Sequence, residues 1–192
     1  EAVAHLSPGA TTPAMSLNLS HWLRQEIAQG RVKVDENAQR ARVVFKGDGM
    51  FAGGTAQLSP ASAQVLTKVA DAVNRVSGRI IVTGHTDNQP IHTASVPDNQ
   101  ALSEQRARAV VKLLRDHQVA DARLVARGLG DTQAVAANDS AAGRALNRRV
   151  EIEVQLQGPL QVPGPASPNP SLTTSLTEGE ELVTDPQGAP HR

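Results

Sequence analysis

The sequence has no cysteine, no tyrosine, two phenylalanines and one tryptophan among its 192 residues. The absence of cysteine excludes disulfides, thiolate metal sites and cysteine nucleophiles. So few aromatic residues argue against the base-stacking platforms of proteins that bind single-stranded nucleic acid. The formal net charge is zero, so no overall field favours nucleic acid either. We therefore expect no nucleic-acid partner.

Long apolar runs are also missing. No stretch of about 18 apolar residues occurs, so nothing in the sequence is expected to span a bilayer. No signal peptide is recognisable. Because the chain begins with Glu1 and not with methionine, we expect a processed product or a fragment, and any membrane anchor would precede Glu1.

Composition divides the chain into three parts. Residues 1–15 are small and polar with two prolines, as is typical of a linker. Residues 157–192 hold seven of the twelve prolines, four acidic residues and one basic residue, without any regular period. We expect this part to be a disordered tail. Residues 16–156 carry clear hydrophobic periods and are predicted to form one folded domain with a modest core.

Two long amphipathic helices are predicted within this domain. One begins after the N-cap Ser59, has Pro60 in its first position and stops at Gly78. The other takes Asn99 as N-cap and runs to about His117. Each helix carries one apolar stripe, so each is expected to cover a sheet with that face.

Strand signals lie around these helices. The run Ile80–Val82 is apolar throughout and predicts a strand covered on both faces. Residues 150–156 alternate apolar and polar side chains, as a half-buried strand does. The other predicted elements are a short helix over 19–27, a hairpin over 32–45, a strand over 123–126 and a short helix over 143–147. Together they predict an α+β fold, a two-layer sandwich of two long helices on a mixed sheet of about four strands.

Arg106 has an unusual place on the second long helix. At about 100° per residue it falls in the middle of the apolar stripe that contains Leu102, Val110 and Leu114. It also lies in the first half of the helix, where the helix dipole disfavours a cation. A buried, unpaired charge is costly, so Arg106 needs either an internal carboxylate or an anionic ligand. Helix geometry alone leaves both alternatives open.

Asp87 follows the predicted strand Ile80–Val82 at the rim of the sheet, a usual position for ligand-binding groups. The loop over 88–97 returns the chain to the start of the Arg106 helix, so Asp87 and Arg106 can reach one pocket. A guanidinium matches a carboxylate, and an aspartate accepts from an ammonium group. The pair therefore predicts a site for a small zwitterion, such as the head group of an amino acid.

Three motifs carry a family resemblance. They are Thr86-Asp87, then Asn99 with Leu102-Ser103 and Arg106-Ala107, then Gly143-Arg144 with Asn147-Arg148-Arg149-Val150. Over about residues 30–156 the chain resembles the OmpA-like peptidoglycan-binding domain of outer-membrane porins, the Pal lipoprotein and the flagellar stator protein MotB. The resemblance implies a domain that is not an enzyme and needs no cofactor. It also implies that the diaminopimelate of the peptidoglycan stem peptide binds with its ammonium on Asp87 and its carboxylate on Arg106.

The same resemblance implies further ligand-binding residues. These are Thr86, Asn99, Leu102, Phe51, Asn147 and Arg148. Asn147 and Arg148 would line or buttress the pocket, and Phe51 belongs to a loop that approaches the ligand through backbone groups. Many relatives have Asp or Asn beside this phenylalanine, whereas Ala52 stands here, so one side-chain contact is expected to be missing.

The segments 27–36 and 47–51 resemble the extended DotU-type (TssL) inner-membrane subunit of type VI secretion systems. This resemblance implies a periplasmic domain of an inner-membrane-anchored protein, with other secretion-complex membrane subunits as partners. The interval from Asp87 to Arg106 is longer than in the porins and resembles the stator branch, so a flagellar-stator-like wall anchor is one alternative. A structural module that binds protein partners and not peptidoglycan is another.

A metal-dependent or hydrolytic site is the remaining alternative. His85, Asp87, His92 and Asp98 are the residues that could form one. None of them has a ligand spacing with a known mechanism, and no third partner orients His85. We therefore expect no metal and no catalysis, with His85 at the rim of the sheet or in the core.

Overall fold

The structure is a computed structural model that describes residues 17–157. The predicted linker over 1–15, and all but the first residue of the predicted tail over 157–192, lie outside these residues. In chain order the elements are α1 (Leu19–Trp22), α2 (Arg24–Ala28), β1 (Val32–Glu36), β2 (Arg40–Lys46), α3 (Pro60–Val73), β3 (Gly78–His85), α4 (Asn99–Asp116), β4 (Leu124–Gly128), α5 (Ala141–Asn147) and β5 (Arg149–Leu156). No helix in the described part of the chain has the length and apolar character needed to cross a membrane.

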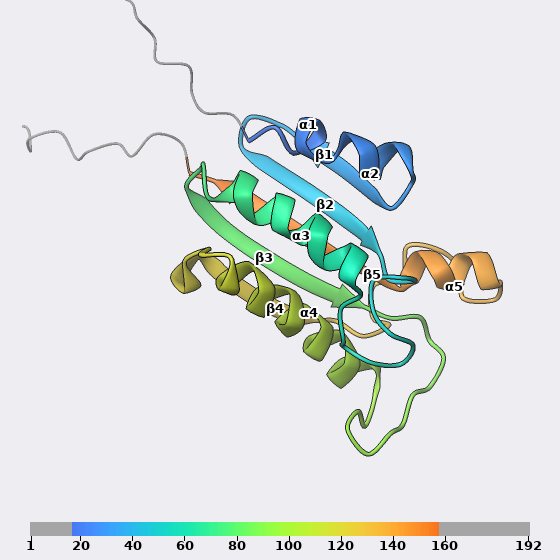
Figure 1. Ribbon diagram of the computed structural model, residues 1–192. Helices are drawn as coiled ribbons and strands as arrows, with labels where there is room; N and C mark the ends of the chain where they lie inside the picture. The colour runs from blue at the N-terminus through green and yellow to red at the C-terminus, as the bar shows by residue number, and fades with distance from the viewer. Residues whose placement is uncertain (1–16, 158–192) are drawn as a thin grey trace, which may run out of the picture. The chain divides into compact units, whose positions relative to one another are not determined.

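Five strands form one mixed sheet in the order β1-β2-β5-β3-β4. The pairs β1–β2, β2–β5 and β3–β5 are antiparallel, whereas β3 and β4 are parallel. The parallel pair is connected through α4, the kind of crossover that parallel strands require. Strand β5 lies at the centre of the sheet, between β2 and β3, which come much earlier in the sequence (Figure 1). The predicted α+β class is confirmed, with five strands in place of about four.

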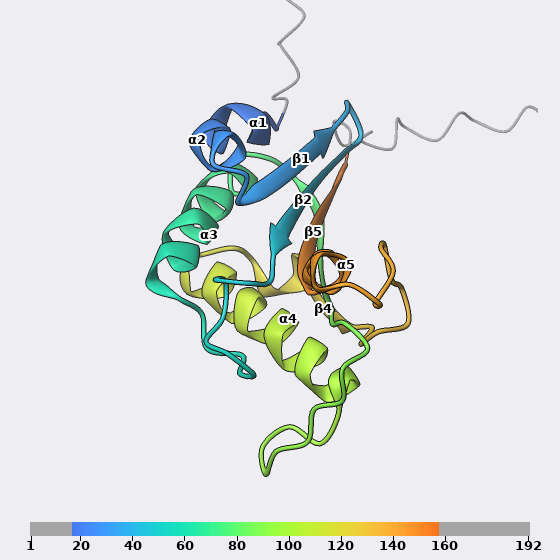
Figure 2. The same cartoon turned by 90° about the vertical axis from the view of Figure 1, so that its right-hand side faces the viewer.

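The two long helices α3 and α4 cover one face of this sheet (Figures 1 and 2). Their apolar stripes meet the inward-facing side chains of the strands, and burial of these surfaces is the main source of stability. The core includes Leu66, Val69 and Val73 from α3, Val110 and Leu114 from α4, and Val43, Ile80, Val82, Ile152 and Val154 from the strands. The predicted two-layer sandwich is therefore confirmed.

Strand β3 differs from the prediction on one point. Ile80 and Val82 are fully buried in the core, but Ile81 is only partly buried. Successive side chains of a strand point to opposite faces, so Ile81 lies on the face away from the core, where its register partner on β5 is Glu153. The prediction that this strand is covered on both faces is wrong, because an apolar run of three residues does not specify what lies on the second face.

The end of α3 also differs from the prediction. The helix begins after the N-cap Ser59 as predicted, but it ends at Val73, before Gly78. Gly78 is the first residue of β3 and has φ +141°, and a Cβ there would lie 2.0 Å from the carbonyl oxygen of Gln155 on β5. Strand pairing, and not helix termination, therefore requires the glycine.

The helix predicted over 19–27 is divided into α1 and α2 at Leu23, whose backbone leaves the helical region. Leu23 is fully buried, whereas Ile27, expected on the apolar stripe, is 36% exposed. Glu26 takes the inner position and accepts a hydrogen bond from Lys68 Nζ of α3 at 2.6 Å. The two short helices are therefore fastened to the helical layer by an ion pair as well as by apolar contacts.

Candidate functional site

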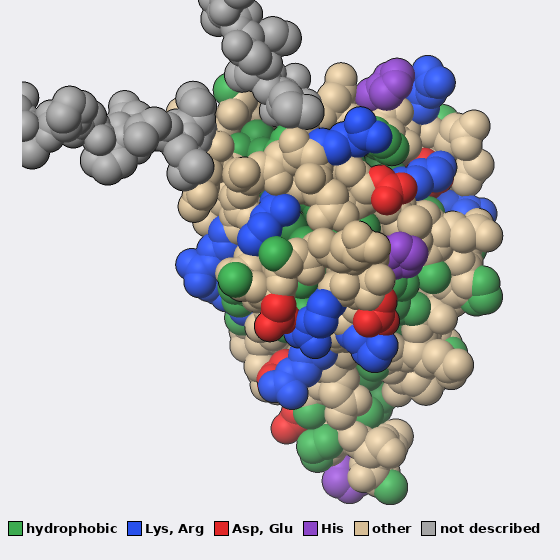
Figure 3. Space-filling view, turned by 60° about the vertical axis from the view of Figure 1, so that its left-hand side comes forward, with side chains coloured by type: hydrophobic (Ala, Val, Ile, Leu, Met, Phe, Trp, Pro, Cys, Tyr) green, Lys and Arg blue, Asp and Glu red, His purple; other side chains and the backbone are tan. Residues whose placement is uncertain are grey.

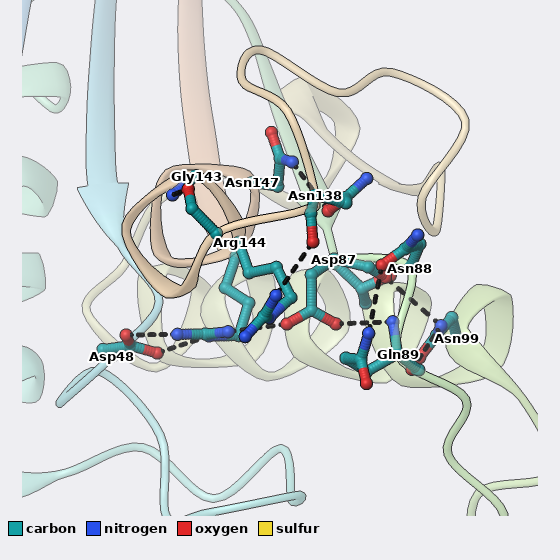
Figure 4. Close-up of polar contacts among 12 residues, drawn as sticks. Asp48, Asp87, Asn88, Gln89, Asn99, Asn138, Gly143, Arg144 and Asn147 are labelled. Carbon is teal, nitrogen blue, oxygen red and sulfur yellow. Dashed lines mark hydrogen bonds and ion pairs between the residues drawn. The ribbon is translucent and has the colours of Figure 1, made fainter.

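The chain after β3 fixes the backbone of Asp87 with hydrogen bonds from two predicted site residues. The Thr86 N–H donates to the carbonyl of Gly130 at 2.9 Å, and the Thr86 hydroxyl donates to the carbonyl of Asp87 at 2.9 Å. Asn99 Nδ2 donates to the carbonyls of Asp87 and Gln89, at 3.3 and 2.9 Å (Figure 4). Thr86 and Asn99 thus position Asp87, and Asp87 itself is only 7% exposed.

Asn99 is available for this contact because it is not the N-cap of α4, contrary to the prediction. Asp98 is the cap, and its Oδ1 accepts from the Ala101 N–H at 2.7 Å. Aspartate and asparagine are comparable caps, so the sequence does not distinguish two neighbouring candidates. The chain at Asp87 determines which residue caps α4, because the carbonyls of Asp87 and Gln89 accept hydrogen bonds from the Asn99 amide.

Arg106 is buried, as its place on the apolar stripe predicts, with 8% exposure. Its Nε donates to the carbonyl of Thr55 at 2.9 Å, and its guanidinium carbon lies 5.0 Å from the centre of the Phe51 ring, a cation–π contact. Burial lowers the pKa of Arg106 from its usual value, and the nearby carboxylates of Asp48 and Asp87 oppose that shift. The Arg106 guanidinium is therefore held by the Thr55 carbonyl and the Phe51 ring, close to the charges of Asp48 and Asp87.

Arg106 makes no ion pair with a carboxylate of residues 17–157. Its one hydrogen bond to these residues uses Nε, so both terminal nitrogens remain without a carboxylate from the described chain. Phe51 contributes its ring to this site, and Leu102, one turn earlier on α4, is buried as well. Of the two alternatives for Arg106, pairing with an internal carboxylate is not observed in this part of the chain.

Arg148 connects the carboxylates of Asp48 and Asp87 beside Arg106. Its Nε and Nη2 donate to the two oxygens of Asp48, both at 2.7 Å, and its Nη1 donates to Asp87 Oδ2 at 2.6 Å. Asp87 Oδ1 accepts from the Gln89 N–H at 3.0 Å (Figure 4). The two bonds to Asp48, ahead of the single bond to Asp87, raise the pKa of Arg148, and the same guanidinium lowers the pKa of Asp48.

Asp48 is a site residue that the motifs miss. It lies 100 positions from Arg148 in the sequence, and the backbones of the two segments meet. The Gly47 N–H donates to the Arg148 carbonyl at 2.7 Å, and a Cβ on Gly47 would lie 2.6 Å from that oxygen. The available signal was an acid between two glycines, Gly47-Asp48-Gly49, directly after a predicted strand.

Asn147 is fully buried and supports the loop that precedes α5. Its Oδ1 accepts from the N–H groups of Val135 and Ala136, and its Nδ2 donates to the Ala136 carbonyl and to Asn138 Oδ1. Arg144 Nη1 donates to the Asn138 carbonyl at 2.9 Å, so both side chains hold the same loop (Figure 4). Between lining and buttressing, the geometry of Asn147 favours buttressing.

His85 is buried at the end of β3, on the same face of the sheet as Ile81, away from the core. Its Nδ1 has no hydrogen-bond partner in the described chain, and its Nε2 lies 3.7 Å from Glu151 Oε1. Burial, followed by the charge of Arg149, lowers the pKa of His85 to about 4, so the ring is neutral at pH 7. Glu151 is already paired with Arg42 and Arg149, at 2.6 and 2.7 Å. Residues 17–157 contain no group of three His, Cys, Asp or Glu side chains placed to hold a metal ion.

Two carboxylates and two guanidiniums therefore share this site, and their formal charges cancel. A zwitterionic ligand suits such a site because it adds one charge of each sign. On the face drawn in Figure 3, acidic and basic side chains of the described residues lie beside one another. On α4, for example, Arg108 pairs with Glu104 and Lys112 pairs with Asp116.

A sequence model of the OmpA family matches residues 50–148, which are 99 of the 192 residues. The chain belongs to the OmpA family. The match extends from the loop that carries Phe51 to Arg148, so it includes Asp87 and Arg106 but not Asp48. OmpA-like domains are non-catalytic, in agreement with the prediction that the chain is not an enzyme.

Known relatives of this OmpA-family chain include proteins of the bacterial envelope. The structure of the cell wall anchor of the T6SS from Pseudomonas aeruginosa matches with a TM-score of 0.69 and 41% identity, over 73% of this chain and 98% of that one. The outer-membrane lipoprotein YfiB of P. aeruginosa is 39% identical over 106 residues, 55% of this chain and 61% of that protein. The peptidoglycan-binding protein ArfA of Mycobacterium tuberculosis is 39% identical over 105 residues, 54% of this chain and 31% of that protein. The chain thus spans less than two thirds of these two full-length relatives.

Proposed function

We propose that this OmpA-family domain binds peptidoglycan without catalysis and anchors a membrane complex to the cell wall. The observation that carries the proposal is Arg106, which is buried, held by Thr55 and Phe51, and not paired with any carboxylate of residues 17–157. Natural proteins rarely keep a buried cation without a partner unless function requires it. An anionic group of a ligand would supply the missing partner.

The ligand group that fits best is the free end of diaminopimelate in the stem peptide. Its carboxylate would take the terminal nitrogens of Arg106 in a bidentate pair, and its ammonium would donate to Asp87. Each charge-assisted hydrogen bond contributes about 1.5–3 kcal/mol before desolvation is subtracted. One such head group gives modest affinity, and the many copies along a peptidoglycan strand raise the overall strength by avidity.

The other predicted site residues have supporting roles in this proposal. Thr86 and Asn99 fix the backbone of Asp87, and Asn147 fixes the loop before α5. Leu102 is a buried neighbour of Arg106 on α4. Phe51 would act through its ring beneath the guanidinium, in addition to any contact from its backbone.

The cellular context that we favour is a periplasmic domain of an inner-membrane-anchored type VI secretion protein. The similarity to a structure described as the cell wall anchor of the T6SS, at 41% identity over 98% of that chain, supports this context. Other membrane subunits of the secretion complex would then be partners, and the membrane contact would come from an anchor outside this chain. A flagellar-stator-like anchor and a purely structural module remain the alternatives to be tested.

Binding to a muropeptide that contains diaminopimelate tests the proposal directly. We expect calorimetry or NMR titration to detect binding by the wild type. Asp87→Asn and Arg106→Gln should each weaken it by about tenfold or more, because each removes one charge-assisted contact. Purified sacculi should likewise retain the wild-type protein and release both variants.

Two controls separate specific recognition from general charge effects. Arg108→Gln removes an exposed guanidinium from the same helix, two positions from Arg106, and should leave the affinity unchanged. A muropeptide with lysine in place of diaminopimelate keeps the ammonium but lacks the carboxylate, so it should bind more weakly. A folded wild type that binds neither peptide nor sacculi would contradict the proposal and favour the structural module.

A further inference from the structure

Both carboxylate oxygens of Asp87 already accept hydrogen bonds within the protein. Its Oδ2 already accepts from Arg148 Nη1 at 2.6 Å, and its Oδ1 accepts from the Gln89 N–H. Each oxygen could accept a second hydrogen bond, but Asp87 is only 7% exposed and a guanidinium already lies 2.6 Å from Oδ2, so a ligand ammonium at Asp87 meets a like charge and competes with a donor already in place. The backbone donor is fixed by the loop, so the side chain of Arg148 is the donor that can leave.

Arg148 divides its bonds unequally between the two acids. Two nitrogens face Asp48 in a bidentate pair and only one faces Asp87. Leaving Asp87 would cost Arg148 one hydrogen bond and would keep its charge neutralised by Asp48. The bidentate pair also has the fixed geometry that makes carboxylate–guanidinium contacts strong.

The backbone keeps Asp48 in the place that makes this division possible. The Gly47 N–H donates to the Arg148 carbonyl, and Gly47 lies so close that no Cβ fits between them. The side chains of Asp48 and Arg148 therefore extend from two segments that are joined at their backbones. Ala52, later in the same loop, supplies no carboxylate, so Asp48 is the acid that this loop brings to the site.

We propose that Asp48 is a positioning residue that holds Arg148 away from full pairing with Asp87, and that the ligand ammonium binds by displacing the single Arg148–Asp87 hydrogen bond. This inference rests on the proposed function. The exchange is balanced in charge: the ammonium replaces a guanidinium at Asp87, Arg148 stays on Asp48, and the ligand carboxylate pairs with Arg106. Asp48 would thus select ligands that carry both an ammonium and a carboxylate.

The site would select zwitterions because a ligand with only one of the two charged groups makes only one of the two contacts. A ligand without an ammonium group cannot remove Arg148 from Asp87, so it gains only the contact with Arg106. A ligand without a carboxylate displaces Arg148 but leaves Arg106 unpaired. Only a zwitterion both displaces Arg148 from Asp87 and supplies a carboxylate to Arg106.

A double-mutant cycle on Asp48 and Arg148 tests the inference, with binding of one diaminopimelate muropeptide as the measurement. Asp48→Asn should weaken binding by about tenfold. Without the Asp48 carboxylate, Arg148 can form a bidentate pair with Asp87 and compete more strongly with the ammonium. Arg148→Gln removes the competitor for Asp87 and should strengthen binding, because the ammonium then displaces no guanidinium. The double variant should therefore bind better than Asp48→Asn alone and about as tightly as Arg148→Gln alone, because Asp48 acts only through Arg148.

Asp116→Asn is the matched control, because it also removes a carboxylate from an ion pair, in this case an exposed pair with Lys112 on α4. Its affinity should equal that of the wild type. The NMR fingerprint and the unfolding midpoint of every variant establish that each is folded. A double variant that binds as weakly as Asp48→Asn, or more weakly, would overturn the inference and leave the proposed function intact.

A second measurement uses only the wild-type protein. On addition of the muropeptide, the carboxyl 13C resonance of Asp87 should shift strongly, while the Nε–H resonance of Arg148 should move little because its bond to Asp48 persists. Loss of the Arg148–Asp48 contact on binding would overturn the inference. A wild type that does not bind at all would instead overturn the proposed function, and the inference with it.

Discussion

At the scale of single residues, the site is built from groups that a stable core would avoid. Arg106 is buried on an apolar stripe, and burial lowers its pKa because the charged form loses hydration. The pKa of Arg148 is raised and the pKa of Asp48 is lowered, because each has the other as a partner. Both shifts favour the charged form, whereas the shift of Arg106 favours the neutral form. The contrast identifies Arg106 as the guanidinium of the site that forms no direct ion pair within residues 17–157.

His85 makes folding stability depend on pH. Its pKa is about 4 in the folded protein against a usual value near 6.5, so the unfolded chain binds the additional proton between these values. Stability should therefore be unaffected by His85 above pH 6.5 and should fall as the pH decreases toward 4, by about 3 kcal/mol at most. Urea unfolding at pH 7.5 and pH 5 measures this difference, which should be much smaller in His85→Gln.

The exposed His92 provides the control for this prediction, because His92→Gln should retain the wild-type difference between the two pH values. Glu151 also acts in the same direction, since its folded-state pKa is lowered by its ion pairs despite burial. Its contribution is lost only below its usual value of about 4.5, so measurements at pH 5 and above report mainly on His85. An unchanged pH dependence in His85→Gln would contradict the assignment.

At the scale of elements, glycines set the distance between α4 and the strands beneath it. A Cβ on Gly84 of β3 would lie 2.1 Å from the Ser103 carbonyl of α4, and one on Gly128 of β4 would lie 2.4 Å from the Glu104 nitrogen. Backbone atoms cannot move aside as a flexible side chain can. This close packing is what brings the end of β3, with Asp87, beside the first half of α4, with Arg106.

Gly84→Ala should therefore lower the free energy of unfolding by about 1–3 kcal/mol, because β3 and α4 must separate to admit the methyl group. The same displacement should weaken muropeptide binding, since it moves Asp87 relative to Arg106. Chemical denaturation and calorimetry measure the two effects. Gly53→Ala is the matched control, because a Cβ at Gly53 meets nothing within 4 Å, and it should be nearly neutral.

Most elements could be predicted because each depends on local spacing alone. The stripe that contains Leu102 and Val110 predicts α4 and places Arg106 on its buried side, and both are confirmed. The details that could not be predicted depend on residues distant in sequence. Asp98 rather than Asn99 caps α4 because the loop near Asp87 takes the Asn99 amide, and Asp48 enters the site only because β2 pairs with β5.

At the scale of the whole molecule, residues 17–157 form one core, and the site lies at one end of its sheet. The core residues come from α1 through β5, with members from both helices of the covering layer. A fragment of residues 17–157 should therefore fold by itself, with an unfolding midpoint within a few degrees of that of the full chain. Calorimetric scans of the two proteins test this, and a fragment without a cooperative transition would contradict it.

The central position of β5 determines when the residues of the candidate site come together during folding. β5 pairs with β2, formed about 100 residues earlier, and with β3, so the sheet stays divided until the final strand inserts between its two halves. Pairings between such distant segments are slow to form. Arg148 immediately precedes that strand, so a nascent chain that lacks it has Asp87 and Arg106 but not the guanidinium that links Asp87 to Asp48. The ion pairs that join Asp87 to Asp48 through Arg148 are thus completed only when the final strand takes its place.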